Sequence, residues 1–484
     1  MNIFRRATVC TLLSLSLPLA FQGPGVAAAA PGTAPGHSVR GTAETGIELP
    51  RPTGRYAVGT QKLHLSDRRR PDPWVPSAPR ELMVSVHYPA VPSGRAPAAY
   101  MTEVEARLLL EARGLAGIVS GAAVSGARTH ARVDARPAKG RFPLVLLSPG
   151  FSMPRTTLTA LANDLASRGY VVAAVDHAYE SVGTSFPGGR VLTCRACERV
   201  ATDEERARVA VNRARDLSFV IDRLTTPRAP SGTARGQRSL PYPRMVDTRW
   251  IGVAGHSVGG AAAAEVMLQD RRVRAGVNLD GNFFVPSAGA GLAGRPFMMM
   301  GARATHSPGS PDSDWQDAWT RLEGWKRWLT VAGAEHFTFT DLPVLAERLG
   351  LTDPAAPLSG ERSWQLTRDY TAAFFDTHLR GRQRPCSTGP PPTDQRSRSP
   401  GCDSRGTGGC PAGHEHSARS RLHADPRCGK APGNAWPSPA CARTPRPRDV
   451  GPPGRRHHDP PRRRCGGGPA VDQERNPWRV RRVS

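Results

Sequence analysis

From Phe142 to Gly381 the chain alternates continuous apolar runs with amphipathic helical patterns, and this alternation constrains the fold most. Continuous apolar runs are typical of strands buried on both faces, as in a parallel sheet covered by helices. We therefore predict an α/β fold, with a mostly parallel central sheet flanked by helices. Strands are expected at 142–150, 170–177, 250–257, 273–281, 295–303 and 326–336, and helices at 156–169, 203–224, 258–270, 313–325 and 363–381.

The segment before Phe142 has a different character. Residues 59–67 and 80–90 alternate apolar and polar side chains, which predicts half-buried antiparallel strands. Residues 103–118 have helical spacing with an apolar face. This helix is interpreted either as a lid or wall over a pocket or as an ordinary packing helix.

The motif "GHSVGG" at 255–260 predicts the position of a nucleophile, Ser257. In a glycine-rich chain the G-x-S-x-G pattern has little weight alone, but here it joins a predicted strand to a predicted helix, which is the context of a nucleophile elbow. Gly255 and Gly259 are expected to allow the sharp turn. Ligands of such sheets bind beyond the carboxyl ends of the strands, where Ser257 lies.

A serine hydroxyl needs a base and an orienting carboxylate to become a nucleophile. In the order Ser, acid, His, the candidates are Ser257, Asp280 in "NLDG" and His336 in "GAEHFTF". Other residues could serve as the acid or as the base. The alternative acids follow the next predicted strand, and the alternative bases are histidines elsewhere in the chain. They are Asp312 and Asp314 for the acid, and His177, His256, His306 and His378 for the base.

An acyl-transfer site also needs donors for the oxyanion. One is expected from the main-chain N–H of Val258, at the start of the helix after the nucleophile. The second is expected from the loop after "LLSPG", where the N–H of Phe151 is the candidate. A helix N-terminus beneath the serine adds favourable electrostatic potential.

Seven segments together resemble the platelet-activating factor acetylhydrolase family of α/β hydrolases, which is related to secreted bacterial lipases and polyester hydrolases. They are "LPRPTGRYAVGT", "RELMVSVHYPA", "FPLVLLSPGFSMPR", "VVAAVDHAYES", "GHSVGG", "NLDG" and "GAEHFTFTD", in that order between Leu49 and Arg384. The resemblance implies that Ser257, Asp280 and His336 form the triad and that Phe151 serves the oxyanion hole. It further implies hydrolysis of short or oxidised acyl esters of glycerophospholipids without a metal or other cofactor.

One departure from that family pattern concerns the oxyanion loop. Many members carry a His-Gly pair there, whereas this chain has Ser148, Pro149 and Gly150. The main-chain N–H of Phe151 remains the expected donor in this loop.

The composition of the first 55 residues indicates an export signal and a leader rather than part of a folded domain. Two arginines, an apolar run and small residues near Ala29 and Ala30 form a signal peptide over 1–30, so the chain is expected to be secreted. Residues 31–55 read as a loose leader, and no later segment predicts a transmembrane span in the mature chain. In an exported chain, Cys194 and Cys197 of "TCRAC" are disulfide candidates, with a redox pair or half a zinc site as alternatives.

The catalytic domain is predicted over 56–384, and a different composition begins at 385. From Cys386 onward there are 19 Lys and Arg against 8 Asp and Glu, so this part holds nearly half of the net charge of +25. It contains no Ile, Met, Phe or Tyr, which predicts disorder over 385–484. We interpret it as a basic arm, as an inert extension, or as the product of a frameshift near codons 383–388.

Three functions are compatible with these patterns. The first is a secreted serine esterase acting on phospholipid acyl esters, with peripheral contact to lipid surfaces and no specific nucleic-acid partner. The second is a broader carboxylesterase, lipase or polyester hydrolase. The third is a non-catalytic cationic protein that binds anionic envelopes through its tail.

Overall fold

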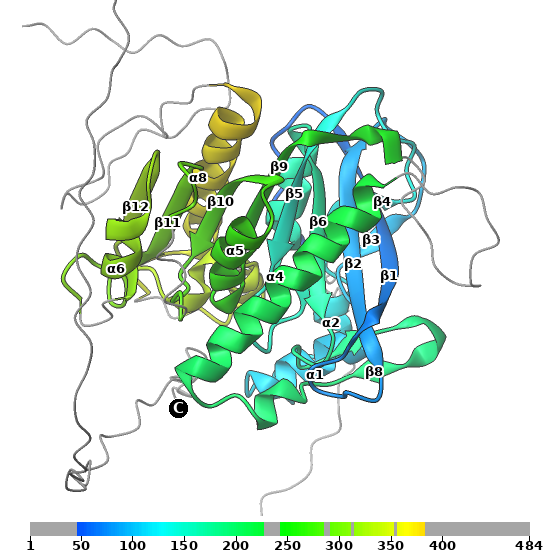
Figure 1. Ribbon diagram of the computed structural model, residues 1–484. Coiled ribbons are helices and arrows are strands. Elements are labelled where there is room, and N and C mark those ends of the chain that lie inside the picture. The colour runs from blue at the N-terminus through cyan, green and yellow to red at the C-terminus, as the bar shows by residue number, and fades with distance from the viewer. Residues whose placement is uncertain (1–45, 227–242, 285–290, 311–313, 353–355, 383–484) are drawn as a thin grey trace, which may run out of the picture. The chain divides into compact units, whose positions relative to one another are not determined.

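A computed structural model describes residues 46–226, 243–284, 291–310, 314–352 and 356–382. Their main feature is a ten-stranded sheet with the order β12-β11-β10-β9-β5-β6-β2-β1-β4-β3 (Figure 1). The α/β-hydrolase prediction is confirmed by this mostly parallel sheet with its covering helices. The expected signal peptide and the 385–484 tail lie outside the described residues.

Six neighbouring strands of this sheet, from β12 to β6, are parallel. They are β5 (Phe142–Ser148), β6 (Val171–His177), β9 (Val246–His256), β10 (Val273–Leu279), β11 (Phe297–Ala302) and β12 (Lys326–Val331). Because their carboxyl ends share one edge of the sheet, side chains that follow them are brought together there.

The remaining strands continue the sheet beyond β6, and β2 pairs antiparallel with both β6 and β1, as the alternating pattern predicts. They are β1 (Ala57–Pro71), β2 (Pro79–Ala90), β3 (Pro97–Ala99) and β4 (Arg128–Val133). A separate two-stranded pair is formed by β7 (Thr184–Ser185) and β8 (Val191–Leu192).

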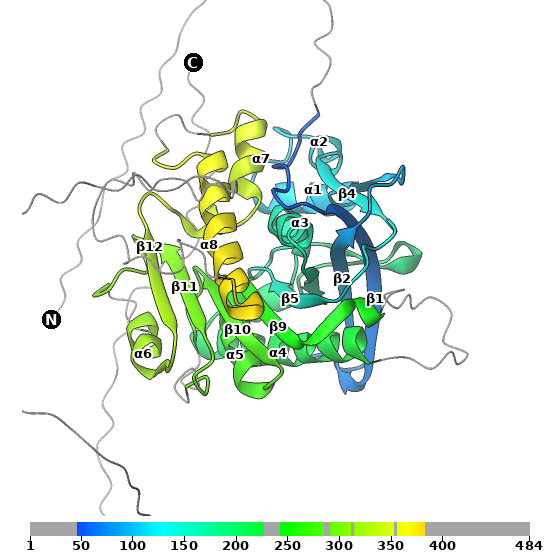
Figure 2. The same ribbon diagram turned by 90° about the horizontal axis from the view of Figure 1, so that it is seen from above.

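Helices cover both faces of the sheet, as the view from above shows (Figure 2). One face carries α4 (Asp203–Thr225), α5 (Val258–Gln269) and α6 (Asp314–Arg321). The other carries α3 (Thr159–Ser167) and α8 (Gly360–Arg380), with α1 (Glu103–Ala112), α2 (Gly121–Ser125) and α7 (Leu342–Arg348) beyond the carboxyl edge.

The continuous apolar runs are explained by this two-sided burial. In β5, Leu144 and Leu146 face the α4–α5 side, whereas Val145 and Leu147 face the α3–α8 side, and all four are fully buried. Burying an aliphatic side chain contributes about 1.5–3 kcal/mol, so such strands stabilise both halves of the core. No helix in the described ranges combines the length and the apolar character that a membrane crossing requires.

Two segments differ from the sequence-based expectations. Part of the expected leader, within residues 46–55, packs against the rest of the protein: Leu49 is 1% exposed, and the Thr53 hydroxyl donates to Asp164 at 2.7 Å. The compact region therefore begins before residue 56. The helix expected over 103–118 ends at Ala112, because Gly114 and Gly117 adopt left-handed backbone conformations.

Candidate active site

Ser257 lies in a sharp turn between β9 and α5, as the motif predicts. Its backbone has φ 56° and ψ −129°, a conformation that is strained for a residue with a side chain. The turn is held by main-chain hydrogen bonds, because the Ser257 N–H donates to Leu279 O at 2.9 Å and the Gly260 N–H donates to Ser257 O at 2.7 Å. This strand–serine–helix geometry is that of a nucleophile elbow.

The glycines around Ser257 are required by space. A Cβ on Gly255 would lie 1.9 Å from the Gly259 carbonyl oxygen, and a Cβ on Gly259 would lie 2.1 Å from the Ser148 carbonyl oxygen. Both obstacles are main-chain atoms, which cannot move away at low cost. The elbow is therefore in direct backbone contact with the loop that follows β5.

The three predicted triad residues come together at the carboxyl edge of the sheet. His336 Nε2 lies 3.0 Å from Ser257 Oγ, and His336 Nδ1 lies 2.7 Å from Asp280 Oδ2. His336 begins a short 3₁₀ helix, His336–Phe339, after β12, and its side chain is 47% exposed. In this arrangement an imidazole can take a proton from the hydroxyl while a buried carboxylate orients it.

Asp280 follows β10 in a left-handed conformation with φ 57°, and its side chain is 1% exposed. Its Oδ1 atom accepts hydrogen bonds from the Ala302 N–H at 2.7 Å and from His306 Nδ1 at 2.8 Å. Burial alone would raise the pKa of Asp280, but the hydrogen bonds from His306 and His336 outweigh burial and lower it. Asp280 is thus held as a carboxylate.

The sequence indicates His306 only as an alternative base and gives no sign that it is a second imidazole on Asp280. Its Nε2 atom lies 2.9 Å from Asn282 Oδ1, and its ring lies 4.2 Å from the Trp315 ring. The alternative acid Asp314 instead accepts the main-chain N–H of Phe283 at 2.7 Å. Asp312 lies outside the described residues.

His256, beside the nucleophile, is fully buried. It is not the base itself but contacts the residue that is, His336. Its Nε2 donates to the His336 carbonyl oxygen at 2.7 Å, and the two rings are 4.8 Å apart. Burial, and then the nearby His336, lower the pKa of His256 to about 3, so its ring is neutral. A Cβ on Gly150 would lie 2.8 Å from Nδ1, so this ring also fills the space beneath the oxyanion loop.

The two remaining candidate bases, His177 and His378, have structural contacts. His177 is buried between Ser148 Oγ, at 3.1 Å, and Asp216 Oδ2, at 2.8 Å, where burial lowers its pKa. His378 packs against Trp325 and Phe374 in α8, and burial lowers its pKa to about 4. Neither is hydrogen-bonded to Ser257 or Asp280 in the described part of the chain.

The expected oxyanion donors lie on two segments that touch. Phe151 packs against a small buried cluster that includes Val258 and Ala261 of α5. A Cβ on Gly259 would lie 2.7 Å from the Pro149 carbonyl oxygen, so the loop runs directly over the start of the helix. Phe151 therefore lies against the start of α5, which directly follows Ser257.

An apolar pocket lies between α1 and α7, next to the segment that carries the base. The Arg113 guanidinium, at one side of the pocket, lies 4.5 Å from the ring centre of Phe337, the residue after His336. Leucines supply most of the lining: Leu109, Leu110, Leu115, Leu342, Leu345 and Leu349.

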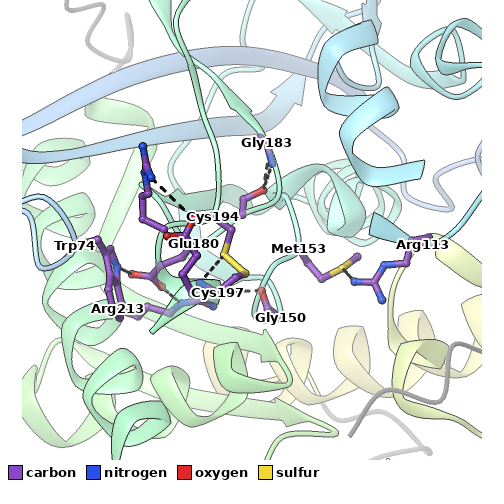
Figure 3. Close-up of a disulfide and its surroundings, with 12 residues drawn as sticks. Trp74, Arg113, Gly150, Met153, Glu180, Gly183, Cys194, Cys197 and Arg213 are labelled. Atoms are coloured by element: carbon purple, nitrogen blue, oxygen red, sulfur yellow. Dashed lines mark hydrogen bonds and ion pairs between the residues drawn. A yellow bond between two sulfur atoms is a disulfide. The ribbon is translucent and has the colours of Figure 1, made fainter. Parts of the chain in front are cut away.

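Cys194 and Cys197 form a disulfide in the structure, with an S–S distance of 2.04 Å (Figure 3). The loop that it closes is tied to the segment after β6, because the Ala196 N–H donates to Tyr179 O at 3.0 Å. Within the described ranges, no group of three or more His, Cys, Asp or Glu side chains is placed to hold a metal ion.

A mostly parallel sheet, a serine elbow at its carboxyl edge and a histidine held by a buried carboxylate define an α/β hydrolase, here a carboxylic ester hydrolase. The sequence model of one family, described as platelet-activating factor acetylhydrolase, isoform II, matches residues 42–188 and 243–353. These ranges are more than half of the chain. The chain therefore belongs to this family, as its motifs indicated.

Individual relatives agree on ester hydrolysis and differ in substrate. A probable 1-alkyl-2-acetylglycerophosphocholine esterase of Arthroderma benhamiae is 25% identical over 375 residues, covering 71% of this chain and 91% of the relative. The platelet-activating factor acetylhydrolase of Bos taurus is 24% identical over 258 residues, covering 49% of this chain and 56% of the relative. A solved ferulic acid esterase from Streptomyces cinnamoneus is 46% identical, with a TM-score of 0.61, covering 71% of this chain and 96% of that chain.

Proposed function

We propose that this protein is an exported serine esterase that hydrolyses short or oxidised acyl esters of glycerophospholipids. Ser257 is the nucleophile, His336 the general base and Asp280 the orienting carboxylate. The single observation that carries the proposal is the continuous relay from Ser257 Oγ to His336 Nε2, at 3.0 Å, and from His336 Nδ1 to Asp280 Oδ2, at 2.7 Å.

The proposed reaction proceeds through an acyl-enzyme. His336 takes the Ser257 proton as Oγ attacks the ester carbonyl, while the N–H groups of Val258 and Phe151 stabilise the oxyanion. His336 then gives the proton to the leaving alcohol. Water, activated by the same imidazole, attacks the acyl carbon and releases the acid and free Ser257.

The phospholipid assignment rests on the family and on the apolar pocket beside Phe337. A pocket lined by leucines suits an alkyl or acyl chain, whose burial contributes about 0.8 kcal/mol per methylene. The family match also favours an enzyme over a non-catalytic cationic binding protein.

A second candidate substrate class is the ester of an aromatic acid. It is favoured by the 46% identity to a ferulic acid esterase, which is higher than the 25% identity to the Arthroderma relative. The chemistry at Ser257 is the same for both classes, so the choice depends on the groups that surround the acyl and alcohol parts.

An ester panel tests both the mechanism and the substrate. The purified protein is assayed with phosphatidylcholines of increasing sn-2 chain length, p-nitrophenyl esters and methyl ferulate, with Ser257→Ala as the control. The proposal predicts the highest kcat/KM for acetyl and other short sn-2 chains, and stoichiometric labelling by a fluorophosphonate that Ser257→Ala abolishes. Preference for methyl ferulate would transfer the assignment to the second class, and unchanged activity of Ser257→Ala would refute the mechanism.

Export and the role of the tail are tested separately. Amino-terminal sequencing of the protein recovered outside the cell should give a start near Ala29 or Ala30. A chain ended at Arg384 should retain full hydrolysis, because all proposed catalytic groups precede that residue. Loss of turnover in the shortened but folded protein would show that the tail contributes to catalysis.

A further inference from the structure

A buried arginine on α4 holds the main chain of the oxyanion loop. Arg213 is 1% exposed, and its Nη1 donates to the Pro149 carbonyl oxygen at 2.5 Å. Its Nη2 makes a longer hydrogen bond of 3.5 Å to the Gly150 carbonyl oxygen. Its Nε donates to Glu180 Oε2 at 2.7 Å, and both side chains are seen in Figure 3.

These contacts with the loop carbonyls also orient the Phe151 N–H, although Arg213 does not contact that group. The Gly150 carbonyl and the Phe151 N–H belong to one planar trans peptide, so they point in opposite directions. Fixing the Gly150 oxygen toward α4 therefore fixes the Phe151 N–H toward the other side of the loop. We propose that Arg213 is a positioning residue that aims the Phe151 N–H at the oxyanion, an inference that rests on the proposed acyl-transfer function.

The arginine is itself firmly placed. Glu180 is 1% exposed, and its Oε1 accepts hydrogen bonds from Trp74 Nε1 at 3.0 Å and from Arg80 Nη2 at 2.9 Å. Burial alone would raise the pKa of Glu180, but the charges of Arg213 and Arg80 outweigh it and lower the pKa, so the carboxylate stays ionised. A fixed anion on one side and two carbonyl oxygens on the other leave the guanidinium little freedom.

Glu180 also holds the far end of the same loop through its main chain. The Ser152 N–H donates to the Glu180 carbonyl oxygen at 3.0 Å, and the Val182 N–H donates to Ser152 O at 3.0 Å. Ser152 has φ 62°, a left-handed conformation that a non-glycine residue keeps only when its surroundings enforce it. The loop is thus anchored on both sides of Phe151, by Arg213 before it and by Glu180 after it.

The contacts need the shape of arginine. Three acceptors from two segments, Glu180 Oε2 and the carbonyl oxygens of Pro149 and Gly150, surround one planar group, which matches the rigid fork of five N–H donors in a guanidinium. A lysine ammonium at this position could keep the charge opposite Glu180 but would not reach the same set of acceptors. Substitution by lysine therefore separates the charge of Arg213 from its geometry.

The test compares three variants of the full chain. Arg213→Lys removes the fork, and Arg213→Met combined with Glu180→Gln removes it while leaving no unpaired charge between the two. Arg380→Lys is the matched control, because Arg380 donates to a main-chain carbonyl, Arg168 O at 2.7 Å, and pairs with Asp376 at the amino end of β6, away from the site. Each variant is checked by thermal unfolding before assay.

The readouts are kcat and KM for p-nitrophenyl acetate and the inhibition constant of a trifluoromethyl ketone. This ketone forms a tetrahedral adduct when Ser257 Oγ bonds to its carbonyl carbon, the hydroxyl proton moves to His336, and the resulting oxyanion enters the hole. Removing one oxyanion donor costs about 100- to 1,000-fold in kcat. A misaimed donor should cost about 10- to 100-fold, with KM changed less than about threefold.

The inference is supported if both folded Arg213 variants lose kcat and if the ketone inhibition constant rises by the same factor as kcat/KM falls. The kcat of Arg380→Lys should meanwhile stay within twofold of wild type. The inference is overturned if either folded Arg213 variant keeps kcat within twofold of wild type. It is also overturned if kcat falls while ketone affinity is unchanged, or if Arg380→Lys causes the same loss. If Arg213→Lys does not fold, the charge-balanced double variant decides. Failure of the proposed function gives a different signature, namely hydrolysis that survives Ser257→Ala.

Discussion

His256 gives this protein an acid sensitivity whose size can be worked out from its surroundings. The ring is 0% exposed, and it donates from Nε2 to His336 O. Its pKa is lowered from 6.5 to about 3 by burial and by His336. Below pH 6.5 the unfolded state therefore binds a proton that the folded state does not, and the stability that depends on neutral His256 is lost as the pH falls toward 3.

The magnitude follows from the lowered pKa. Each pH unit below 6.5 shifts the balance by about 1.4 kcal/mol until the folded pKa is reached. At pH 5 the contribution of His256 is thus a loss of about 2 kcal/mol. His256→Gln removes the titration and keeps an N–H donor for the His336 carbonyl, so its unfolding free energy should fall by about 2 kcal/mol less than that of wild type between pH 7 and pH 5.

The assay is urea unfolding of both proteins at several pH values, with intrinsic fluorescence as the probe. Comparing the change in each protein, rather than absolute stabilities, removes the contributions of other buried histidines because they are common to both. Equal losses in wild type and His256→Gln would refute the reasoning. So would a larger loss in the variant.

Three further predictions concern the acid, the elbow and a buried carboxyl. Asp280→Asn should lower kcat by about 10,000-fold because the imidazole loses its orienting carboxylate, whereas Asp314→Asn should stay within tenfold of wild type in the same steady-state ester assay. Gly259→Ala should cost at least about 3 kcal/mol in urea unfolding, because its Cβ would lie 2.1 Å from Ser148 O; unchanged stability would contradict the packing. Burial raises the pKa of Asp341 well above its usual range, so above pH 4 the folded protein keeps a proton that the unfolded chain loses. The stability that depends on this proton is fully present below pH 4 and is lost as the pH rises toward the raised pKa. Asp341→Asn should therefore melt a few degrees higher than wild type at pH 7 but not at pH 3, and calorimetry that shows no such pH dependence would exclude the effect.

The sequence predicted the parts of the fold that depend on local pattern. Apolar runs located all six parallel strands, and the order of Ser257, Asp280 and His336 matched the carboxyl ends of β9, β10 and β12. Such signals are readable because burial on both faces and turns at strand ends leave local traces.

The supporting contacts could not be read in this way. Arg213 lies in a helical pattern among other arginines, and its carbonyl partner Pro149 is 64 positions away. His306 stands in a loop whose contact with Asp280 depends on how β10 and β11 pair. The packing of Leu49 depends on Arg128, far along the chain. Each depends on tertiary contact between distant segments, for which a single sequence holds no periodic signal.

The backbone contact between Gly259 and the Ser148–Pro149 carbonyls has a practical consequence for redesign. The nucleophile elbow and the oxyanion loop are in main-chain contact, so a side chain inserted between them would displace the catalytic groups before it altered substrate selectivity. Libraries meant to move this enzyme between lipid and aromatic esters should instead vary α1 and α7, whose leucines line the apolar pocket beside the base.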